Sequence, residues 1–176
     1  MGLPSFLNDY ILTISEALDV AEDKTGDFFK FSLGQWKRHH YDIKTQSDLK
    51  DQEIAPHAFA LLNKYEGTID GREIEMRKRD FYFICLQDYQ IEKALEKDKN
   101  LILLPLLIYI FTHELVHIVR FCNFHQRFEI SGLEREREEV VVHGITYQIL
   151  KNLSLPKLDY TLESYRDHRI CDLALS

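Results

Sequence analysis

Two histidines, His113 and His117, lie four residues apart with Glu114 between them, in the apolar sequence IFTHELVHIVRF of residues 110–121. Residues four apart on an α-helix project from one face about one turn from each other, so two imidazoles so placed can share one metal ion. Glu114 is rotated by about 100° from His113 and can reach a water on the open side of that metal. The spacing therefore predicts a metal centre in which a carboxylate serves as general base.

Two ordinary helical histidines are the alternative interpretation of this sequence. Burying both imidazoles and the Glu114 carboxylate in an apolar helix without a shared partner would cost several kcal/mol, whereas one metal ion satisfies all three groups. We therefore favour the metal centre.

The HELVH sequence of residues 113–117 is the HExxH motif, and over roughly residues 65–150 the chain resembles the zincin metallopeptidases. In the metzincin branch a glycine and a third histidine follow the motif. This chain has Arg120 and Asn123 at the matching positions, so that branch is excluded. In the gluzincin branch the third ligand is a glutamate on a later helix, followed four residues on by a polar group.

Glu139 and His143 are similar to that gluzincin pair, because Glu139 follows His117 by 22 residues and His143 follows Glu139 by four. The resemblance implies that the two motif histidines and Glu139 bind zinc, with Glu114 as the general base. His143 stands where the family usually has Asp or Asn. It would support a ligand, stabilise an oxyanion or bind the metal as a fourth ligand.

The helix that carries these residues offers a second carboxylate. Its apolar stripe has Glu138 rather than Glu139 at the centre. We prefer Glu139 because its partner four residues on is His143, and Glu138 remains the alternative. Arg120 is interpreted as an ion-pair partner of this acidic helix. The stripe consists of Val142, Ile145 and Ile149.

The resemblance implies a zinc-dependent hydrolase, a peptidase that cleaves a peptide or protein substrate with metal-activated water. Tyr160 or Tyr165 would steady the oxyanion. The alternative is a non-catalytic metal-binding or regulatory protein, in which His143 as a fourth ligand closes the site.

Composition limits the partners. The formal net charge of -7, without a clustered basic stripe, argues against nucleic acid as a partner.

Cys85, Cys122 and Cys171 form no CxxC and suit buried free thiols, which favours a reducing, cytoplasmic setting. The apolar residues 101–119 are nearly long enough to cross a bilayer, but their ionisable groups indicate a buried core helix, so no membrane partner is expected. The oligomeric state is left open.

The first 64 residues are predicted to be helical. Apolar positions recur at spacings of three and four in residues 5–22 and 56–65, while TGDFF (25–29) and FSLGQW (31–36) interrupt them. Strands follow. Residues 65–69 and 72–76 flank an Asp-Gly turn, and residues 80–87 form a third strand that is expected to line the cleft and pair with a peptide.

Four helical segments are predicted after the strands. They are a charged helix over 89–100, the motif helix with Pro105 near its first turn, the glutamate helix opened by a capping box at Ser131–Glu134, and a short helix in residues 160–175.

The elements predict an α+β, zincin-like fold with a small, mostly antiparallel sheet, an HExxH helix, a following glutamate helix and a helical N-terminal cap. We expect a single domain over residues 1–176. Its parts are the helical region 1–64, the zincin-like core 65–152 and the tail 153–176.

Overall fold

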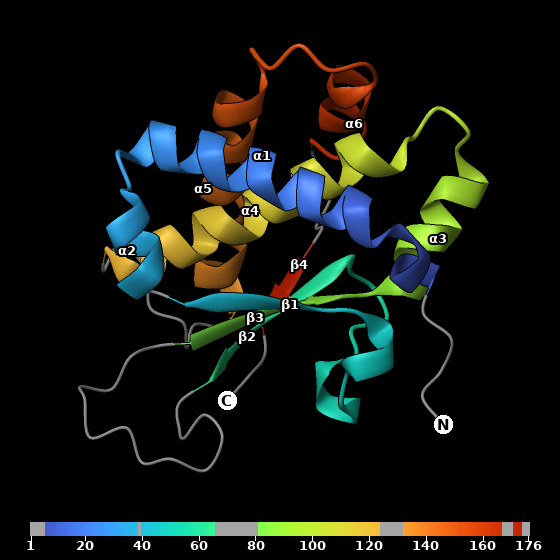
Figure 1. Ribbon diagram of the computed structural model, residues 1–176, viewed down its shortest axis with the longest axis horizontal. Helices are drawn as coiled ribbons and strands as arrows, with labels where there is room; N and C mark the ends of the chain where they lie inside the picture. Colours follow the sequence, from blue (N-terminus) through green and yellow to red (C-terminus); the bar gives the residue numbers. More distant parts are fainter. Residues whose placement is uncertain (1–5, 39, 66–80, 124–131, 167–170, 174–176) are drawn as a thin grey trace.

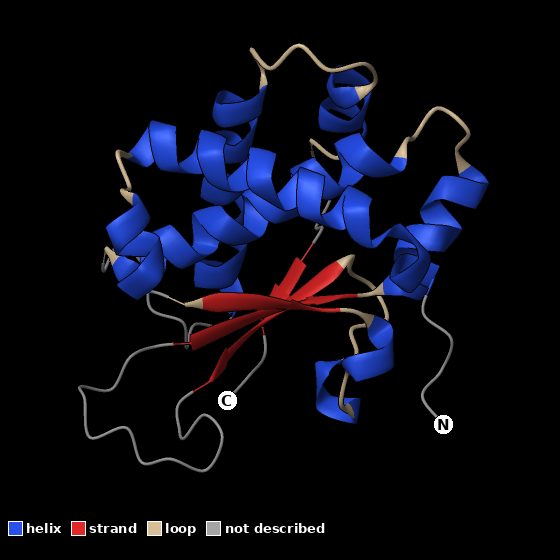
Figure 2. Ribbon diagram, in the orientation of Figure 1, coloured by secondary structure: helices blue, strands red, loops and turns tan. Residues whose placement is uncertain are grey.

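The computed structural model describes residues 6–38, 40–65, 81–123, 132–166 and 171–173. These residues form a mixed α+β fold in which six α-helices accompany a four-stranded sheet. The long helices lie on one face of the sheet, and a short segment with two 3-10 helices lies on the other (Figures 1 and 2).

The elements have the following bounds. The α-helices are α1 (Ile11–Phe29), α2 (Leu33–Arg38), α3 (Asp88–Lys97), α4 (Leu103–Cys122), α5 (Gly132–Leu150) and α6 (Leu158–Ser164). The 3-10 helices are η1 (Phe6–Tyr10), η2 (Gln46–Asp48) and η3 (Asp51–Glu53). The strands are β1 (Tyr41–Lys44), β2 (Ala60–Tyr65), β3 (Phe81–Leu86) and β4 (Cys171–Leu173).

Helix α4 is the centre of the fold and packs against α1, α5, α6 and β3. Pro105 lies in its first turn, as predicted, where the missing N–H removes no intrahelical hydrogen bond. Every residue from Pro105 to Val119 is buried. By length and composition α4 could cross a membrane, but 83% of its most apolar window is buried inside this fold. Protein atoms therefore surround the apolar surface of α4.

Helix α1 lies along α4 and faces it with small side chains. Its buried residues recur at spacings of three and four and include Ala17 and Ala21, which let the two helices approach closely. The predicted interruption at residues 25–29 is wrong, because α1 continues through it. Gly26 is there for packing, since a Cβ on it would lie only 3.2 Å from the carbonyl oxygen of Phe31.

The sheet has the order β1-β3-β2-β4. The pairings of β1 with β3 and of β2 with β4 are parallel, and that of β2 with β3 is antiparallel, so the prediction of a mostly antiparallel sheet is wrong. The third predicted strand is confirmed as β3. It lies between β1 and β2, however, and its backbone pairs on both sides. The prediction that this strand would bind a peptide at the cleft edge is therefore wrong.

The N-terminal region is not uniformly helical. The helix predicted over 56–65 is wrong, because residues 60–65 form β2, and β1 lies in the same region without having been predicted. Alternate residues of β2 face opposite sides: Leu62 joins the core under the helices, and Leu61 packs on the other side with Cys85. A strand buried on both faces has a continuous apolar sequence, which resembles part of a helix.

The remaining predicted elements have mixed outcomes. The helices over 89–100 and from Gly132 are confirmed as α3 and α5. In the tail, α6 ends at Ser164 and residues 171–173 form a strand, so one helix over 160–175 is wrong. The Asp-Gly turn, the strand over 72–76 and Ser131 of the capping box lie outside the described residues.

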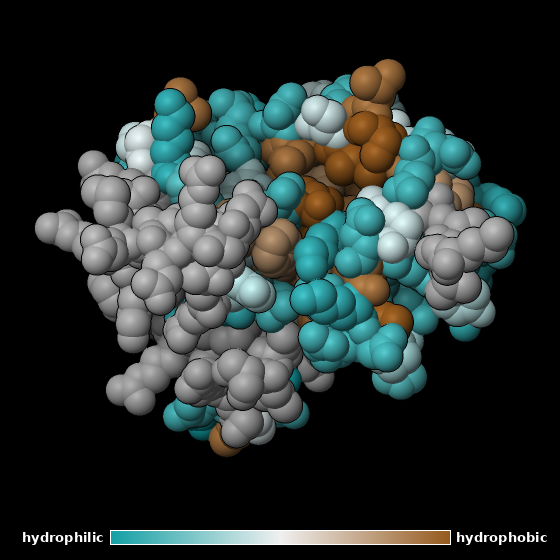
Figure 3. All heavy atoms as spheres, turned by 60° about the horizontal axis from the view of Figure 1, so that its bottom comes forward, coloured by the Kyte–Doolittle hydropathy of each residue, from teal (hydrophilic) through white to brown (hydrophobic). Residues whose placement is uncertain are grey.

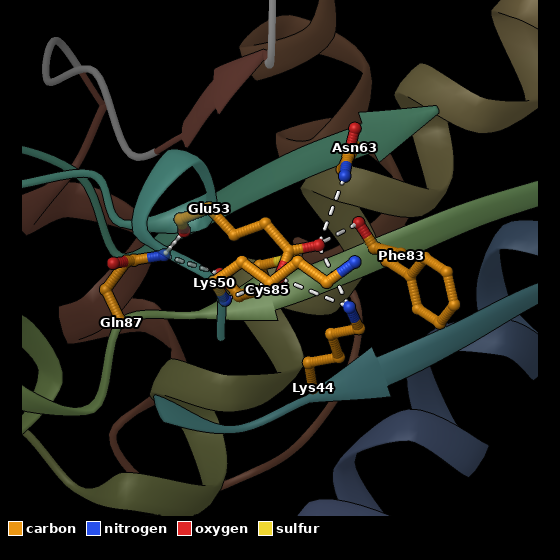
Figure 4. Close-up of polar contacts among 7 residues, drawn as sticks. All are labelled: Lys44, Lys50, Glu53, Asn63, Phe83, Cys85 and Gln87. Carbon is orange, nitrogen blue, oxygen red and sulfur yellow. Dashed lines mark hydrogen bonds and ion pairs between the residues drawn. The ribbon is translucent and has the colours of Figure 1, made fainter. Parts of the chain in front are cut away.

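A buried carboxylate anchors the segment on the far side of the sheet. Glu53 accepts hydrogen bonds from Lys44 Nζ at 2.9 Å, from the Lys50 backbone N–H at 2.9 Å and from Asn63 Nδ2 at 3.2 Å. Figure 4 shows its carboxylate turned toward Lys44 of β1 and Asn63 of β2. Gln87 completes the attachment by donating to the carbonyl oxygen of Glu53 at 2.9 Å. Figure 3 turns this lower side forward and shows apolar residues gathered between hydrophilic ones.

Replacing Glu53 with glutamine should destabilise the protein and reduce its acid sensitivity. Burial favours the neutral acid, but the bonds from Lys50, Lys44 and Asn63 outweigh it and hold the pKa of Glu53 below its ordinary value. Stability from a lowered pKa is present above the unfolded value of about 4.3 and is lost as pH falls. We expect Glu53→Gln to cost about 1–3 kcal/mol at neutral pH.

Urea denaturation at pH 7 and pH 3.5 measures both effects. The exposed Asp51, two residues earlier, provides the control, and Asp51→Asn should change the free energy of unfolding by less than about 0.5 kcal/mol. Equal stabilities of Glu53→Gln and the parent at pH 7 would contradict the anchoring role.

Candidate metal centre

The polar residues of the motif are fully buried in α4. His113, Glu114 and His117 each have 0% of their surface exposed. The two imidazole rings come from one face of the helix, and their centroids are 4.9 Å apart. The helical geometry predicted from their spacing is therefore present, and it lies in the interior of the protein rather than on its surface.

Glu139 of α5 reaches both histidines. Its Oε2 lies 3.2 Å from Nε2 of His113, and its Oε1 lies 3.0 Å from Nε2 of His117. Ligands at about 2.0–2.1 Å in a tetrahedron around zinc are separated by about 3.3 Å. The two distances from the Glu139 carboxylate are therefore those expected between zinc ligands, and two imidazoles and one carboxylate are donor types that zinc binds.

Glu138 has a different partner. Arg120 of α4 donates to it through Nε, and through Nη2 at 3.0 Å. This pairing confirms the predicted role of Arg120 as an ion-pair partner of the acidic helix. Both glutamates are 9% exposed, so burial does not distinguish them. Their partners distinguish the two glutamates, because Glu138 faces the Arg120 guanidinium and Glu139 faces the motif histidines.

His143 lies one turn after Glu139. Its Nε2 lies 3.9 Å from Oε2 of Glu139, and its ring centroid lies 4.7 Å from that of His113. Donor atoms of His113, Glu139 and His143 all lie within 4.8 Å of one another, so these three residues form a group that could hold a metal ion. The second histidine of this group is His143 and not the predicted ligand His117.

Tyr109 orients the His143 ring, and the sequence analysis did not identify it. The Tyr109 hydroxyl donates to the carbonyl oxygen of Tyr165 at 3.3 Å and lies 3.0 Å from Nδ1 of His143. These two contacts hold the His143 ring in place, with its Nε2 on the side of Glu139. The tautomer of His143 decides whether Nδ1 or the hydroxyl donates in the contact between them. Its position in the sequence could have identified it, because Tyr109 lies one turn before His113 on the motif helix.

The charges of the group are coupled. Burial lowers the pKa of His113 to about 4. Burial also disfavours the charged form of His117, but the hydrogen bond and charge of Glu139 outweigh it and raise its pKa. For Glu139 burial favours the neutral acid, yet the two imidazoles hold its pKa well below the usual range. Of the two motif histidines, His117 is therefore the one whose protonated form the surroundings favour.

A cavity of about 750 Å³ lies against this group and is lined by Glu139, His143 and Tyr109. Glu114 is not among the described residues that line it. Its charge instead favours protonation of His117. A molecule in this cavity would thus contact Glu139 and His143 of α5 first.

The two tyrosines predicted for the oxyanion lie elsewhere. The Tyr160 hydroxyl donates to Oδ2 of Asp98 at 2.6 Å. Tyr165 stacks on Tyr109, with centroids 6.2 Å apart, and burial raises its pKa to about 12. Neither is among the described residues that line the cavity.

Comparisons of the chain with protein-family models, with curated proteins and with solved structures found no match. The case for a metal centre therefore rests on the geometry of the described residues.

The two adjacent glutamates should respond differently to alanine. Glu139→Ala should lower zinc affinity at least about tenfold, because it removes the carboxylate between the motif histidines. Glu138→Ala should keep the metal but lower stability by about 1–3 kcal/mol, because Arg120 loses its partner. Elemental analysis and thermal denaturation of both variants measure these outcomes. The reverse order of metal loss would assign the ligand to Glu138.

Zinc affinity should rise with pH. A raised pKa keeps His117 protonated to higher pH than an ordinary histidine, and zinc must displace that proton. We expect about a tenfold gain in affinity per pH unit below the pKa of His117, and a plateau above it. Competition with a chromophoric chelator from pH 5 to 8 measures this slope. An affinity independent of pH over that range would show that His117 is not a ligand.

Proposed function

We propose that this protein is a zinc-dependent hydrolase that cleaves peptide bonds. The observation that supports the proposal is the position of the Glu139 carboxylate, 3.2 and 3.0 Å from Nε2 of the two HExxH histidines. A buried carboxylate and two buried imidazoles at these separations match a metal-binding set, and the nearby cavity offers space for a substrate.

In this proposal each residue has a distinct task. His113, His117 and Glu139 would hold the zinc ion, which lowers the pKa of a bound water toward 7. The Glu114 carboxylate would take a proton from the attacking water and pass it to the leaving nitrogen of the peptide. Glu114 is fully buried on the same helix as the two histidines.

A second candidate is a non-catalytic metal-binding or regulatory protein. Two observations favour it. Donor atoms of His143, His113 and Glu139 all lie within 4.8 Å of one another, which suits His143 as a further ligand. Glu114, in addition, is not among the described residues that line the cavity. Four protein ligands would leave no position for water.

Glu114→Gln should abolish peptide hydrolysis and leave one zinc per chain, because glutamine keeps the shape of the side chain and cannot accept the proton. The double variant His113→Ala/His117→Ala should lose both zinc and activity. The measurements are elemental analysis and cleavage of a quenched fluorescent peptide library. Glu134→Gln, an exposed substitution on α5, should retain activity.

Two outcomes would contradict this hydrolase. Peptide hydrolysis that persists in Glu114→Gln would show that Glu114 is not the general base. A zinc-loaded parent that cleaves no peptide, and whose cobalt-substituted absorption spectrum changes on His143→Ala, would instead support the closed, non-catalytic site.

A further inference from the structure

Helix α5 has an apolar face that the described residues leave exposed. Leu133, Val140 and Tyr147 recur every seven residues, which places them on one side of a helix, and they are 61%, 72% and 44% exposed. The opposite side of α5 is the buried one, with Val142 and Ile149 in the core. A helix covered on one side normally has polar residues on the other. The outward apolar residues of α5 therefore require their own explanation.

This outward face is one wall of the cavity at the metal centre. Val140, Gly144 and Tyr147 line the same cavity of about 750 Å³ that Glu139 and His143 line. Leu162 of α6 adds a further apolar side chain. The cavity is thus a groove along α5 in which apolar side chains lie beside charged and polar ones, with the candidate ligands Glu139 and His143 in its wall. The further polar lining residues are Arg135, Glu136, Gln148 and Arg166.

Gly144 is the second observation that points to a ligand. A glycine inside a helix is less favourable than alanine because of its backbone entropy. Gly26 of α1 is explained by its close neighbours, but among the described residues no heavy atom lies within 4 Å of a Cβ built on Gly144. Packing within the described fold therefore gives no reason for glycine at this position. A ligand whose backbone passes close to the helix gives one.

We infer that the groove binds a peptide with an apolar side chain, which packs against Val140 and Tyr147 while its backbone crosses Gly144. That the bound peptide is a substrate rests on the proposed function. The inference assigns the preference for apolar side chains to residues of α5 that take no part in holding the metal or moving the proton.

The test is fluorescence anisotropy with labelled hexapeptides that differ only in a central Leu, Phe, Ser or Asp. The protein is zinc-loaded Glu114→Gln, so that binding is measured without hydrolysis, and metal-free protein is measured beside it. The Leu and Phe peptides should bind at least about fivefold more tightly than the Ser and Asp peptides, as expected from burying an apolar side chain.

Gly144→Ala gives two opposed readouts. It should raise the thermal midpoint by roughly 2–4 °C through helix propensity and weaken binding of the Leu peptide by roughly tenfold, because the new methyl group occupies the groove. Gly34→Ala in α2 is the control, since its Cβ would make only an ordinary contact at 3.7 Å, and it should not change binding.

A second pair of variants compares neighbouring valines of α5. Val140 lines the groove and Val141, 41% exposed, is not among the described residues that do. Val140→Lys should abolish the preference for Leu and Phe, and Val141→Lys should preserve it. Both positions are exposed, so neither change threatens the core.

The outcomes separate this inference from the proposed function. If the peptides bind as expected but the protein hydrolyses none of them, the peptide-binding groove is supported and the peptidase function is contradicted. A parent that cleaves peptides while Gly144→Ala and Val140→Lys bind and cleave as the parent does would overturn the groove alone. No binding of any peptide, with or without zinc, would also overturn it.

Discussion

The Glu139 carboxylate, placed between two imidazoles that the fold buries completely, is the interaction on which the rest of the structure depends. Helix α4 has no exposed surface at His113, Glu114 or His117. Removing these groups from water is costly unless each finds a partner of suitable charge. Glu139 supplies a negative charge to both histidines from a different helix. The burial of the α4 motif therefore requires that α5 pack on it in one register.

Two adjacent residues fix that register. Glu138 meets Arg120 on one side of the contact, and Glu139 meets His113 and His117 on the other. Adjacent residues on a helix point about 100° apart, so α5 cannot rotate about its axis without breaking one of these contacts. The same rotation turns Val140 and Gly144 outward and His143 toward Tyr109. The shape of the groove is thus a consequence of the ion contacts beneath it.

The parts of the structure that the sequence predicted are those with a local signal. Such signals are the long apolar sequence of α4 and the four-residue spacing of Glu139 and His143, which places both on one side of α5. Strand β2 was missed because a short apolar run such as Ala60–Leu62 fits a buried strand and a buried helix equally well. Strand β1 was missed because its four residues, Tyr41–Lys44, are too few to show a period. The position of β3 inside the sheet depends on its pairing with β1, a strand that is distant in the sequence.

The choice between Glu138 and Glu139 shows the same limit inside the site. The apolar stripe of α5 favoured Glu138, the spacing to His143 favoured Glu139, and both residues are equally buried, so α5 alone gives no single answer. Arg120 of α4 pairs with Glu138, and Glu139 faces the motif histidines. A carboxylate in an apolar stripe therefore indicates a buried cation opposite it as readily as it indicates a metal.

His143 would determine what kind of metal centre these residues could form. Its Nε2 is 3.9 Å from Glu139, farther than the 3.0 and 3.2 Å of the motif histidines. The contact with Tyr109 holds the ring in one orientation. With the ring proton on Nδ1, Nε2 would bind the metal, and with the proton on Nε2 the ring would donate to an oxyanion instead. His143 and a water molecule would therefore compete for the same side of the metal, and the hydroxyl of Tyr109 biases that competition by holding the ring.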